Sequence, residues 1–294
     1  GERRRSRDFP LGLPDQLLSM DMRRTHRGFT LIELVMVIVI LGVIGGMVSV
    51  FMKRPIDAYF DTARRAALAD VADTTLRRMA RDIRKALPNS IQVPNNQCVE
   101  FIPTKTGGRY RVEDKSGAPG TGLDFSAADT GFNMLGSNSA RPADQQIADG
   151  DLIAVYNLGI AGSNAYNGDN TAAVSGTPSE SGSPAETTIT IASKQFPLPS
   201  GSNRFHVIPG TEKVVSYICS GGTLYRNANY AYSSSCPAPT PGTTPVIATN
   251  LDTCNFVYNG SDLQRNGLVQ MTISFTNSGE TVTQYHEIHV NNTP

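Results

Sequence analysis

The feature that most constrains this chain is an uninterrupted apolar run close to its N-terminus. The run extends from Leu34 to Met52 and contains no charged residue over 19 positions. A helix over residues 29–52 would rise roughly 36 Å, which is enough to cross the hydrocarbon core of a bilayer. We therefore predict a transmembrane helix over residues 29–52. An acid, Glu33, stands at its mouth, where burying a carboxylate costs about 2.5–3.5 kcal/mol, so we expect this side chain to have a partner.

Basic residues precede the apolar run. Three arginines and a histidine lie within residues 23–27 and lead into the string Gly-Phe-Thr-Leu-Ile-Glu at residues 28–33. Positive charge ahead of a span places the N-terminus in the cytoplasm, although Lys53 and Arg54 after the span favour the opposite orientation weakly. The C-terminal part of the chain is therefore expected on the far side of the membrane.

The string RGFTLIELVMVIVILGVI at residues 27–44 resembles the leader of type IV prepilins, the family that includes type IV pilins and type II secretion pseudopilins. The resemblance implies that prepilin peptidase, a membrane aspartyl protease, cuts between Gly28 and Phe29, and that Phe29 is then N-methylated. It also implies that Glu33 pairs with the terminal amine of a neighbouring subunit.

The residue types suit these roles. Gly28 suits the cut because it leaves the backbone free to extend. An amine and a carboxylate attract strongly in low dielectric, although desolvation offsets much of the gain. The alternative is an ordinary membrane anchor with a chance glutamate.

Residues 1–28 are interpreted as a leader peptide and set aside from the fold. Leaders of the family are usually short and basic and begin at Met, as the stretch from Met22 to Gly28 does. Residues 1–21 are then either an upstream stretch that is not translated or part of a long-leader variant. Residues 1–28 hold seven Arg and four acids, so the rest has 19 basic and 22 acidic residues and a net charge of −3. This balance gives no support for nucleic-acid binding, and no nucleic acid is expected among the partners.

An amphipathic continuation of the helix is predicted over residues 53–88. Apolar side chains recur at the i, i+3, i+4 spacing of one helix face, at Ile56, Tyr59, Phe60, Ala63, Ala67, Leu68, Val71, Ala72, Leu76, Met79, Ile83 and Leu87. Such a stripe predicts a surface onto which a β-rich body packs. Pro55 is expected to kink the helix and Pro88 to end it, because proline lacks a backbone donor and clashes with the preceding turn.

Residues 89–294 are predicted to form a β-rich body. Runs rich in Val, Ile, Tyr, Phe and Thr predict strands at 97–103, 109–113, 151–157, 187–192, 204–208, 213–219, 222–226, 253–258, 267–275 and 282–290. Hairpins are expected around Ser220-Gly221-Gly222 and Asn277-Ser278-Gly279, and loops at 160–186 and 232–246. The fold class is therefore α+β and pilin-like: a long N-terminal helix, with a transmembrane half and an amphipathic half, packed on an antiparallel β-sheet body.

The four cysteines, Cys98, Cys219, Cys236 and Cys254, all lie in this body. An even number in an oxidising compartment predicts two disulfides, and four cysteines allow three pairings. We expect Cys219–Cys236 as the local pair, because a hairpin and a Pro-rich loop make a nearby return plausible, and Cys98–Cys254 as the remainder. Metal binding is the alternative, but the chain contains no C-x-x-C pair.

Signals for catalysis or metal binding are weak. His286 and His289 are three residues apart in a predicted strand and should point to opposite faces, whereas the zinc motif needs i, i+4 on a helix. Asp149-Gly150-Asp151 and Asn167-Gly168-Asp169-Asn170 are more typical of turns than of calcium loops. The chain contains no G-x-S-x-G, Walker A or G-x-G-x-x-G string. We expect no enzymatic activity, no metal and no cofactor.

Segments after the leader resemble one subgroup of the type IV pilin family. The helix at residues 54–91 and the strings CVEFIPT, VSYICSGGTLYR, QRNGLV and YHEIHVNNTP are similar to minor pilin-like proteins of the mannose-sensitive haemagglutinin (MSHA) pilus, most weakly over residues 130–186. The J-type minor pseudopilin of type II secretion is the near alternative. The resemblance implies a single-pass inner-membrane protein with a periplasmic body that enters a pilus or pseudopilus. Its partners would be prepilin peptidase, other pilin subunits, the assembly platform and membrane lipid. A third interpretation makes the β-body an adhesin.

Overall fold

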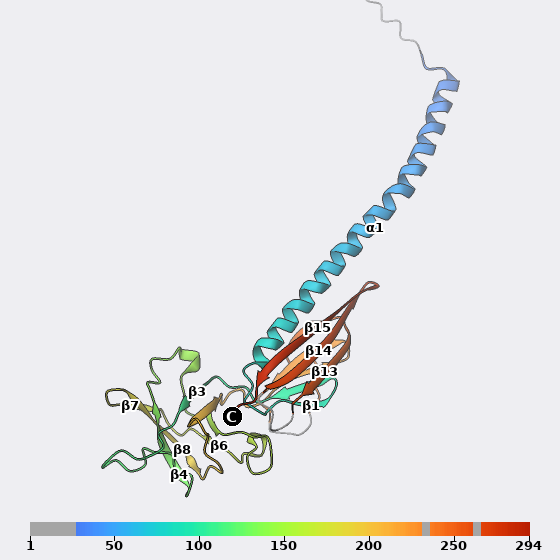
Figure 1. Ribbon diagram of the computed structural model, residues 1–294. Helices are drawn as coiled ribbons and strands as arrows, with labels where there is room; N and C mark the ends of the chain where they lie inside the picture. Colours follow the sequence, from blue (N-terminus) through green and yellow to red (C-terminus); the bar gives the residue numbers. More distant parts are fainter. Residues whose placement is uncertain (1–27, 231–235, 261–265) are drawn as a thin grey trace, which may run out of the picture. The chain divides into compact units, whose positions relative to one another are not determined.

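The computed structural model describes residues 28–230, 236–260 and 266–294. Within these ranges a long helix, α1 (Leu31–Ile83), is followed by strands β1 to β15 and by two short 3-10 helices, η1 (Ala143–Gln145) and η2 (Ala165–Asn167) (Figure 1). The chain divides into two units, Gly1–Asp57 and Ala58–Pro294. The strands all belong to the second unit and pair antiparallel, which confirms the predicted α+β class.

Helix α1 runs through Pro55 without a break and ends at Ile83, before the predicted end at residue 87. After Ile83 the hydrogen bonds change from the i+4 pattern of an α-helix to an i+3 pattern, since the Ala86 N–H donates to the Ile83 carbonyl at 3.0 Å. The Leu87 N–H then donates to the Ile102 carbonyl at 2.7 Å. The chain therefore leaves the helix to pair with an extended segment, several residues ahead of Pro88.

Only the second half of the predicted apolar stripe is buried. Leu68, Ala72, Leu76, Met79 and Ile83 are in the core, as is Leu87 beyond the helix. The expectation was wrong for the first half, because Ile56, Tyr59, Phe60, Ala63, Ala67 and also Val71 are exposed. The last strand, β15 (Glu280–Asn291), begins at Glu280, which pairs with Arg65, so Tyr59, Phe60 and Ala63 precede the part of the helix that the strands cover. Ala67 and Val71 lie within the covered part but are exposed beside the buried Leu68 and Ala72.

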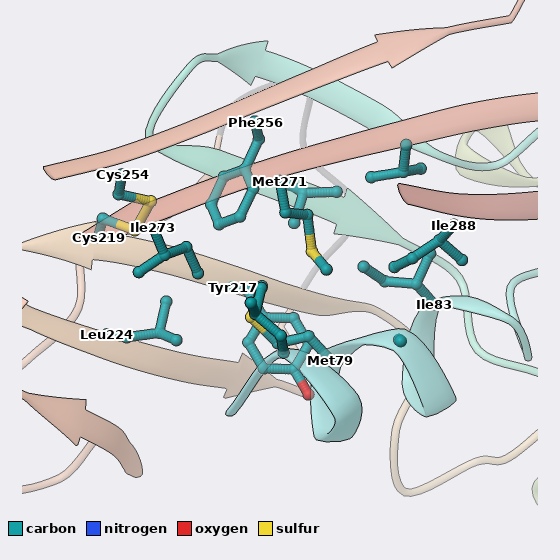
Figure 2. Close-up of a cluster of buried hydrophobic side chains, with 14 of the residues drawn as sticks. Met79, Ile83, Tyr217, Cys219, Leu224, Cys254, Phe256, Met271, Ile273 and Ile288 are labelled. Carbon is teal, nitrogen blue, oxygen red and sulfur yellow. A yellow bond between two sulfur atoms is a disulfide. The ribbon is translucent and has the colours of Figure 1, made fainter. Parts of the chain in front are cut away.

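The buried face of α1 packs on two sheets. One has the order β1 (Gln92–Asn95), β2 (Cys98–Phe101), β10 (Val215–Ser220), β11 (Thr223–Ala228), β12 (Val246–Thr249). The other has the order β13 (Leu251–Asn259), β14 (Asn266–Asn277), β15 (Glu280–Asn291). Figure 2 shows Met79 and Ile83 of the helix together with Tyr217, Met271 and Ile288 of these sheets, all within one buried cluster. The helix and both sheets therefore share one core.

A second lobe is inserted between β2 and β10, and we call residues 104–213 the inserted lobe. It contains a sheet of β3 (Thr106–Arg109), β9 (Arg204–Ile208), β5 (Leu152–Val155) and β6 (Thr171–Ala173). It also contains a sheet of β4 (Asp129–Leu135), β8 (Glu186–Lys194) and β7 (Ser179–Ser181). Its core is separate and includes Phe132, Ile153, Ile189, Phe205 and Val207. Residues 89–294 were predicted as one β-rich body, and their separation into two cores was not predicted.

Both predicted hairpins are confirmed. Ser220 pairs with Thr223, and Asn277 pairs with Glu280, so each loop has two residues. All four loop residues have positive φ, between 50° and 84°. This is the geometry of type I′ turns, which match the twist of the flanking strands.

Other strand predictions need correction. The expected strand at 109–113 is wrong, because β3 ends at Arg109 and Tyr110 makes only an isolated bridge with Met134. The expected loop at 160–186 contains β6 and β7, which are three residues each and consist of small and polar side chains. Pairing with β5 and β8, rather than intrinsic preference, holds them extended. Of the second expected loop, 232–246, residues 232–235 lie outside the described ranges, 236–245 contain no strand, and Val246 begins β12.

The four cysteines form two disulfides, but not in the predicted pairs. Cys98 bonds to Cys236 and Cys219 to Cys254, so the expected Cys219–Cys236 and Cys98–Cys254 pairs were wrong. Cys98 lies opposite Ile218 in β10, and side chains alternate along a strand, so Cys98 and Cys219 point to opposite faces of the sheet. Cys219 faces the shared core, where β13 brings Cys254 close to it (Figure 2). The pairing of the cysteines is therefore determined by strand register rather than by their separation in the sequence.

Candidate functional site

The candidate site is the start of α1, where Thr30 caps the helix. The Glu33 N–H donates to the Thr30 hydroxyl oxygen at 3.3 Å, and the Leu34 N–H donates to the Thr30 carbonyl at 3.1 Å. A Thr followed three residues later by Glu is the pattern of a capping box, which satisfies backbone donors that the first turn leaves free. This cap was not predicted, although the T-x-x-E string at Thr30–Glu33 is its usual sequence signal.

The bond between Gly28 and Phe29 lies just outside the helix. Residues 28–30 are exposed, with Phe29 at 78%, and no atom lies within 4 Å of the position that a Cβ would take on Gly28. A peptide bond that is exposed and outside regular secondary structure is accessible to a protease. The basic residues at 23–27 lie outside the described ranges.

Glu33 is exposed in the first turn of α1. Negative charge is favourable there, because the free N–H groups of a helix start carry partial positive charge. Within residues 28–230, 236–260 and 266–294 the Glu33 carboxylate makes no ion pair. Its predicted pairing with another subunit is not tested by a single chain and stays a prediction.

The helix that follows this start is long and apolar enough to cross a membrane, and it is the only such helix in the described part of the chain. The large side chains from Leu31 to Met52 are all exposed. An apolar segment with no covering protein is what a single-pass anchor requires.

The other residues considered as metal ligands from the sequence lie in turns or in a strand. His286 and His289 lie in β15, one half-buried and the other exposed, on opposite faces as predicted. Asp151 forms an ion pair with Lys105 at 2.6 Å, and Asp169 accepts hydrogen bonds from the Gly162 and Asn164 N–H groups. Across the residues that the structure describes, no three His, Cys, Asp or Glu side chains cluster in a way that could hold a metal ion.

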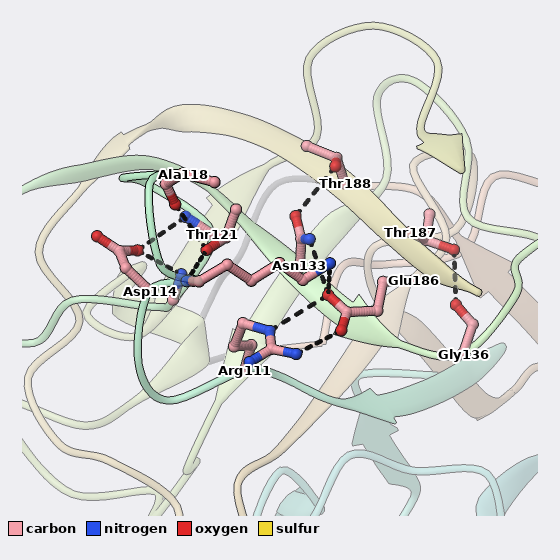
Figure 3. Close-up of polar contacts among 11 residues, drawn as sticks. Arg111, Asp114, Ala118, Thr121, Asn133, Gly136, Glu186, Thr187 and Thr188 are labelled. Atoms are coloured by element: carbon pink, nitrogen blue, oxygen red, sulfur yellow. Dashed lines mark hydrogen bonds and ion pairs between the residues drawn. The ribbon is translucent and has the colours of Figure 1, made fainter. Parts of the chain in front are cut away.

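The inserted lobe contains a polar network around Glu186 that was not predicted (Figure 3). The buried Glu186 carboxylate accepts hydrogen bonds from both Arg111 and Asn133, the latter at 2.9 Å, and pairs with Lys115 at 2.9 Å. The Arg111 hydrogen bonds above all lower the pKa of Glu186 from 4.5 to about 2. Because Glu186 sits at the edge of a predicted loop, no periodic pattern pointed to it.

A second network holds the end of α1. Asp82 accepts hydrogen bonds from the Tyr217 hydroxyl at 2.7 Å and from Arg226 Nε at 3.0 Å, and Arg226 also bonds Glu212 at 2.8 and 3.1 Å. Burial raises the pKa of Tyr217, and the hydrogen bonds to Glu212 raise the pKa of Arg226. These partly buried pairs fix the helix against β10 and β11, and each charge has a partner.

Comparison with known families gives one match. Residues 23–49 match the family described as Prokaryotic N-terminal methylation motif. Comparison with curated proteins and with solved structures found no match. The exposed Gly28–Phe29 bond, the capped start with Glu33 and the apolar half of α1 thus coincide with the matched segment. The chain carries the N-terminal methylation signal of type IV pilins and pseudopilins, followed by an apolar helix.

Proposed function

We propose that this protein is a minor pilin of an MSHA-like type IV pilus, similar to the MSHA biogenesis protein MshO. It would be processed by prepilin peptidase between Gly28 and Phe29 and would enter or prime the filament. It would be a structural subunit rather than an enzyme. The observation that carries the proposal is the methylation motif at residues 23–49, which ends within an exposed apolar helix.

The rest of the molecule supports this role. Two disulfides with no free cysteine among the described residues favour an oxidising compartment, such as the periplasm. The basic leader favours a cytoplasmic N-terminus, which puts the body on the opposite side. The uncovered half of α1 would contact membrane lipid before assembly and other subunits afterwards, with the assembly platform mediating the transfer.

N-terminal mass spectrometry of the membrane-extracted protein tests the proposal. We expect the chain to begin at N-methylated Phe29 in a host with prepilin peptidase, and the Gly28→Val variant to keep its leader, because the added side chain lies next to the scissile bond. Gly46→Val is the matched control within the span and should be cleaved normally. An intact leader in the wild-type protein would contradict the proposal.

Two other functions remain as alternatives. A minor pseudopilin of type II secretion would carry the same motif, and the filament with which the protein copurifies distinguishes the two. An adhesin is favoured by the inserted lobe, which has a core of its own. Loss of surface attachment with normal piliation after changes in that lobe would support the adhesin.

A further inference from the structure

A positively charged groove runs between the C-terminal part of α1 and strand β15. Its volume is about 550 Å³, and it is lined by Arg77, Arg81 and Arg84, by Asp73 and by His286 of β15. Three guanidinium groups thus face one carboxylate. All five residues belong to the unit Ala58–Pro294.

Most of this positive charge has no partner. Arg77 pairs with Asp73 at 2.6 Å. Within the described ranges the side chains of Arg81 and Arg84 make no ion pair, and the buried Nε2 of His286 has no hydrogen-bond partner. Buried polar atoms in native proteins are rarely left unpaired. The exposed guanidinium groups of Arg81 and Arg84 therefore have unused donors for a carboxylate ligand.

The wall of the groove on the sheet side is an edge strand. β15 has 12 residues and pairs with β14 alone among the described strands. An edge strand presents a row of free N–H and C=O groups, and natural proteins commonly blunt it with Pro or Lys. β15 contains neither residue. A further strand can therefore pair with this edge.

We propose that an extended acidic segment of a neighbouring polypeptide pairs with β15 and places its carboxylates in this groove. Alternate residues of a strand repeat every ~6.8 Å, and residues four apart on a helix, such as Arg77 and Arg81, repeat every ~6 Å. Acids at alternate positions of the added strand would therefore face Arg77 and Arg81 of α1 and Arg84, which follows directly after the helix. The inference goes beyond the proposed function and rests on the body alone, so it stands whether or not the chain assembles into a pilus.

Peptide binding to the full-length protein in detergent tests this inference. The probe is a labelled synthetic peptide in which Glu alternates with Thr, followed by fluorescence anisotropy. We expect Arg81→Gln/Arg84→Gln to raise the Kd by about tenfold or more, because two charge-assisted hydrogen bonds are lost. Arg109→Gln/Arg204→Gln removes the same charge from exposed positions of the inserted lobe and should leave the Kd unchanged.

Two further measurements separate the parts of the proposal. Arg81 and Arg84 lie close to the C-terminus of α1, where positive charge also stabilises a helix, and a melting curve measures that role independently of peptide binding. A peptide with N-methylated backbone amides and the same charges should bind more weakly, because it cannot form the strand pairing. This comparison uses the wild-type protein and stays decisive even where a variant does not fold.

Several results would overturn the inference. Equal Kd values for the two double variants would exclude the groove as the binding site of the peptide. Equal affinity of the methylated and unmethylated peptides would exclude strand pairing. Binding of inorganic phosphate that depends on Arg81 and Arg84, with no binding of the peptide, would identify a small-anion site instead.

Discussion

At the scale of single residues, Glu186 is a buried carboxylate whose charge is matched by Arg111 and Lys115. Replacement by Gln keeps the shape but weakens charge-assisted hydrogen bonds, so Glu186→Gln should lower the free energy of unfolding by about 2 kcal/mol. Urea unfolding followed by near-UV circular dichroism measures the change. Glu113→Gln, at an exposed position of the same lobe, is the control and should have little effect.

The same residue predicts a pH dependence. Its pKa is about 2 in the folded protein against an ordinary value of 4.5. Because the folded pKa is lowered, the stabilisation is complete above pH 4.5 and is lost as the pH falls towards 2. Wild-type protein should therefore lose more stability over this interval than Glu186→Gln. Parallel loss in both proteins would show that other carboxylates dominate.

Replacement of Glu33 tests whether this residue is needed for assembly. Glu33→Ala should insert and be cleaved normally, since removing the acid eases insertion, but it should be depleted from sheared filaments because the intersubunit pair is lost. Asp57→Ala, an exposed acid further along α1, is the control. Glu33→Ala at the wild-type level in filaments would contradict an assembly role.

The residues of the leader could be read from the sequence because their chemistry is local. Gly28, Phe29 and Glu33 lie within six consecutive residues, and the structure places them at an exposed helix start. The disulfides could not be paired in the same way, because pairing depends on which strand faces which. Cys98 and Cys219 are neighbours in space but point away from each other.

At the scale of elements, the cap on α1 can be tested directly. Thr30→Ala removes the acceptor for the Glu33 N–H and should cost about 1 kcal/mol at the helix start. Amide hydrogen exchange in detergent should therefore speed up at Glu33 and Leu34. Thr62→Ala is the matched control, since Thr62 lies inside the helix and bonds only the Ala58 carbonyl. Unchanged exchange at Glu33 would show that the cap is not formed in solution.

The uneven burial of α1 gives a second prediction for this element. Leu76 is 2% exposed in the shared core, whereas Val71 on the same predicted stripe is 43% exposed. Leu76→Ala should therefore cost about 3 kcal/mol, and Val71→Ala should stay within about 0.5 kcal/mol of wild type. Urea unfolding compares them. Similar losses at both positions would mean that Val71 is buried in the folded protein, contrary to the structure.

The helix and the two hairpins could be predicted from hydrophobic periodicity and from the turn residues. The helix and both hairpins were found because a 3.6-residue repeat and Gly-containing turns are local signals. β6 and β7 were missed because Thr171–Ala173 and Ser179–Ser181 are extended only through their neighbours. The stripe was predicted too long because a sequence shows that a face is apolar but not how far its partner sheet extends.

At the scale of the whole molecule, the two disulfides interleave along the chain. Cys98–Cys236 spans 138 residues and Cys219–Cys254 spans 35. In the chain-entropy account, removing Cys98–Cys236 should cost about 5 kcal/mol and removing Cys219–Cys254 about 4 kcal/mol. Peptide mapping without reduction should recover these two links. A recovered Cys219–Cys236 peptide would contradict the structure, and four free thiols would also contradict a periplasmic body.

The inserted lobe leaves and re-enters the first sheet at one place, since Phe101 of β2 and Val215 of β10 are paired neighbours. Loop-closure entropy rises only slowly with length, so the sheet tolerates a segment of almost any size between these two residues. Natural selection can then lengthen, trim or exchange residues 104–213 while the register that seats α1 stays intact. We expect descendants of a common ancestor to differ most in this segment, so that one helix-and-sheet frame can present many different outer surfaces.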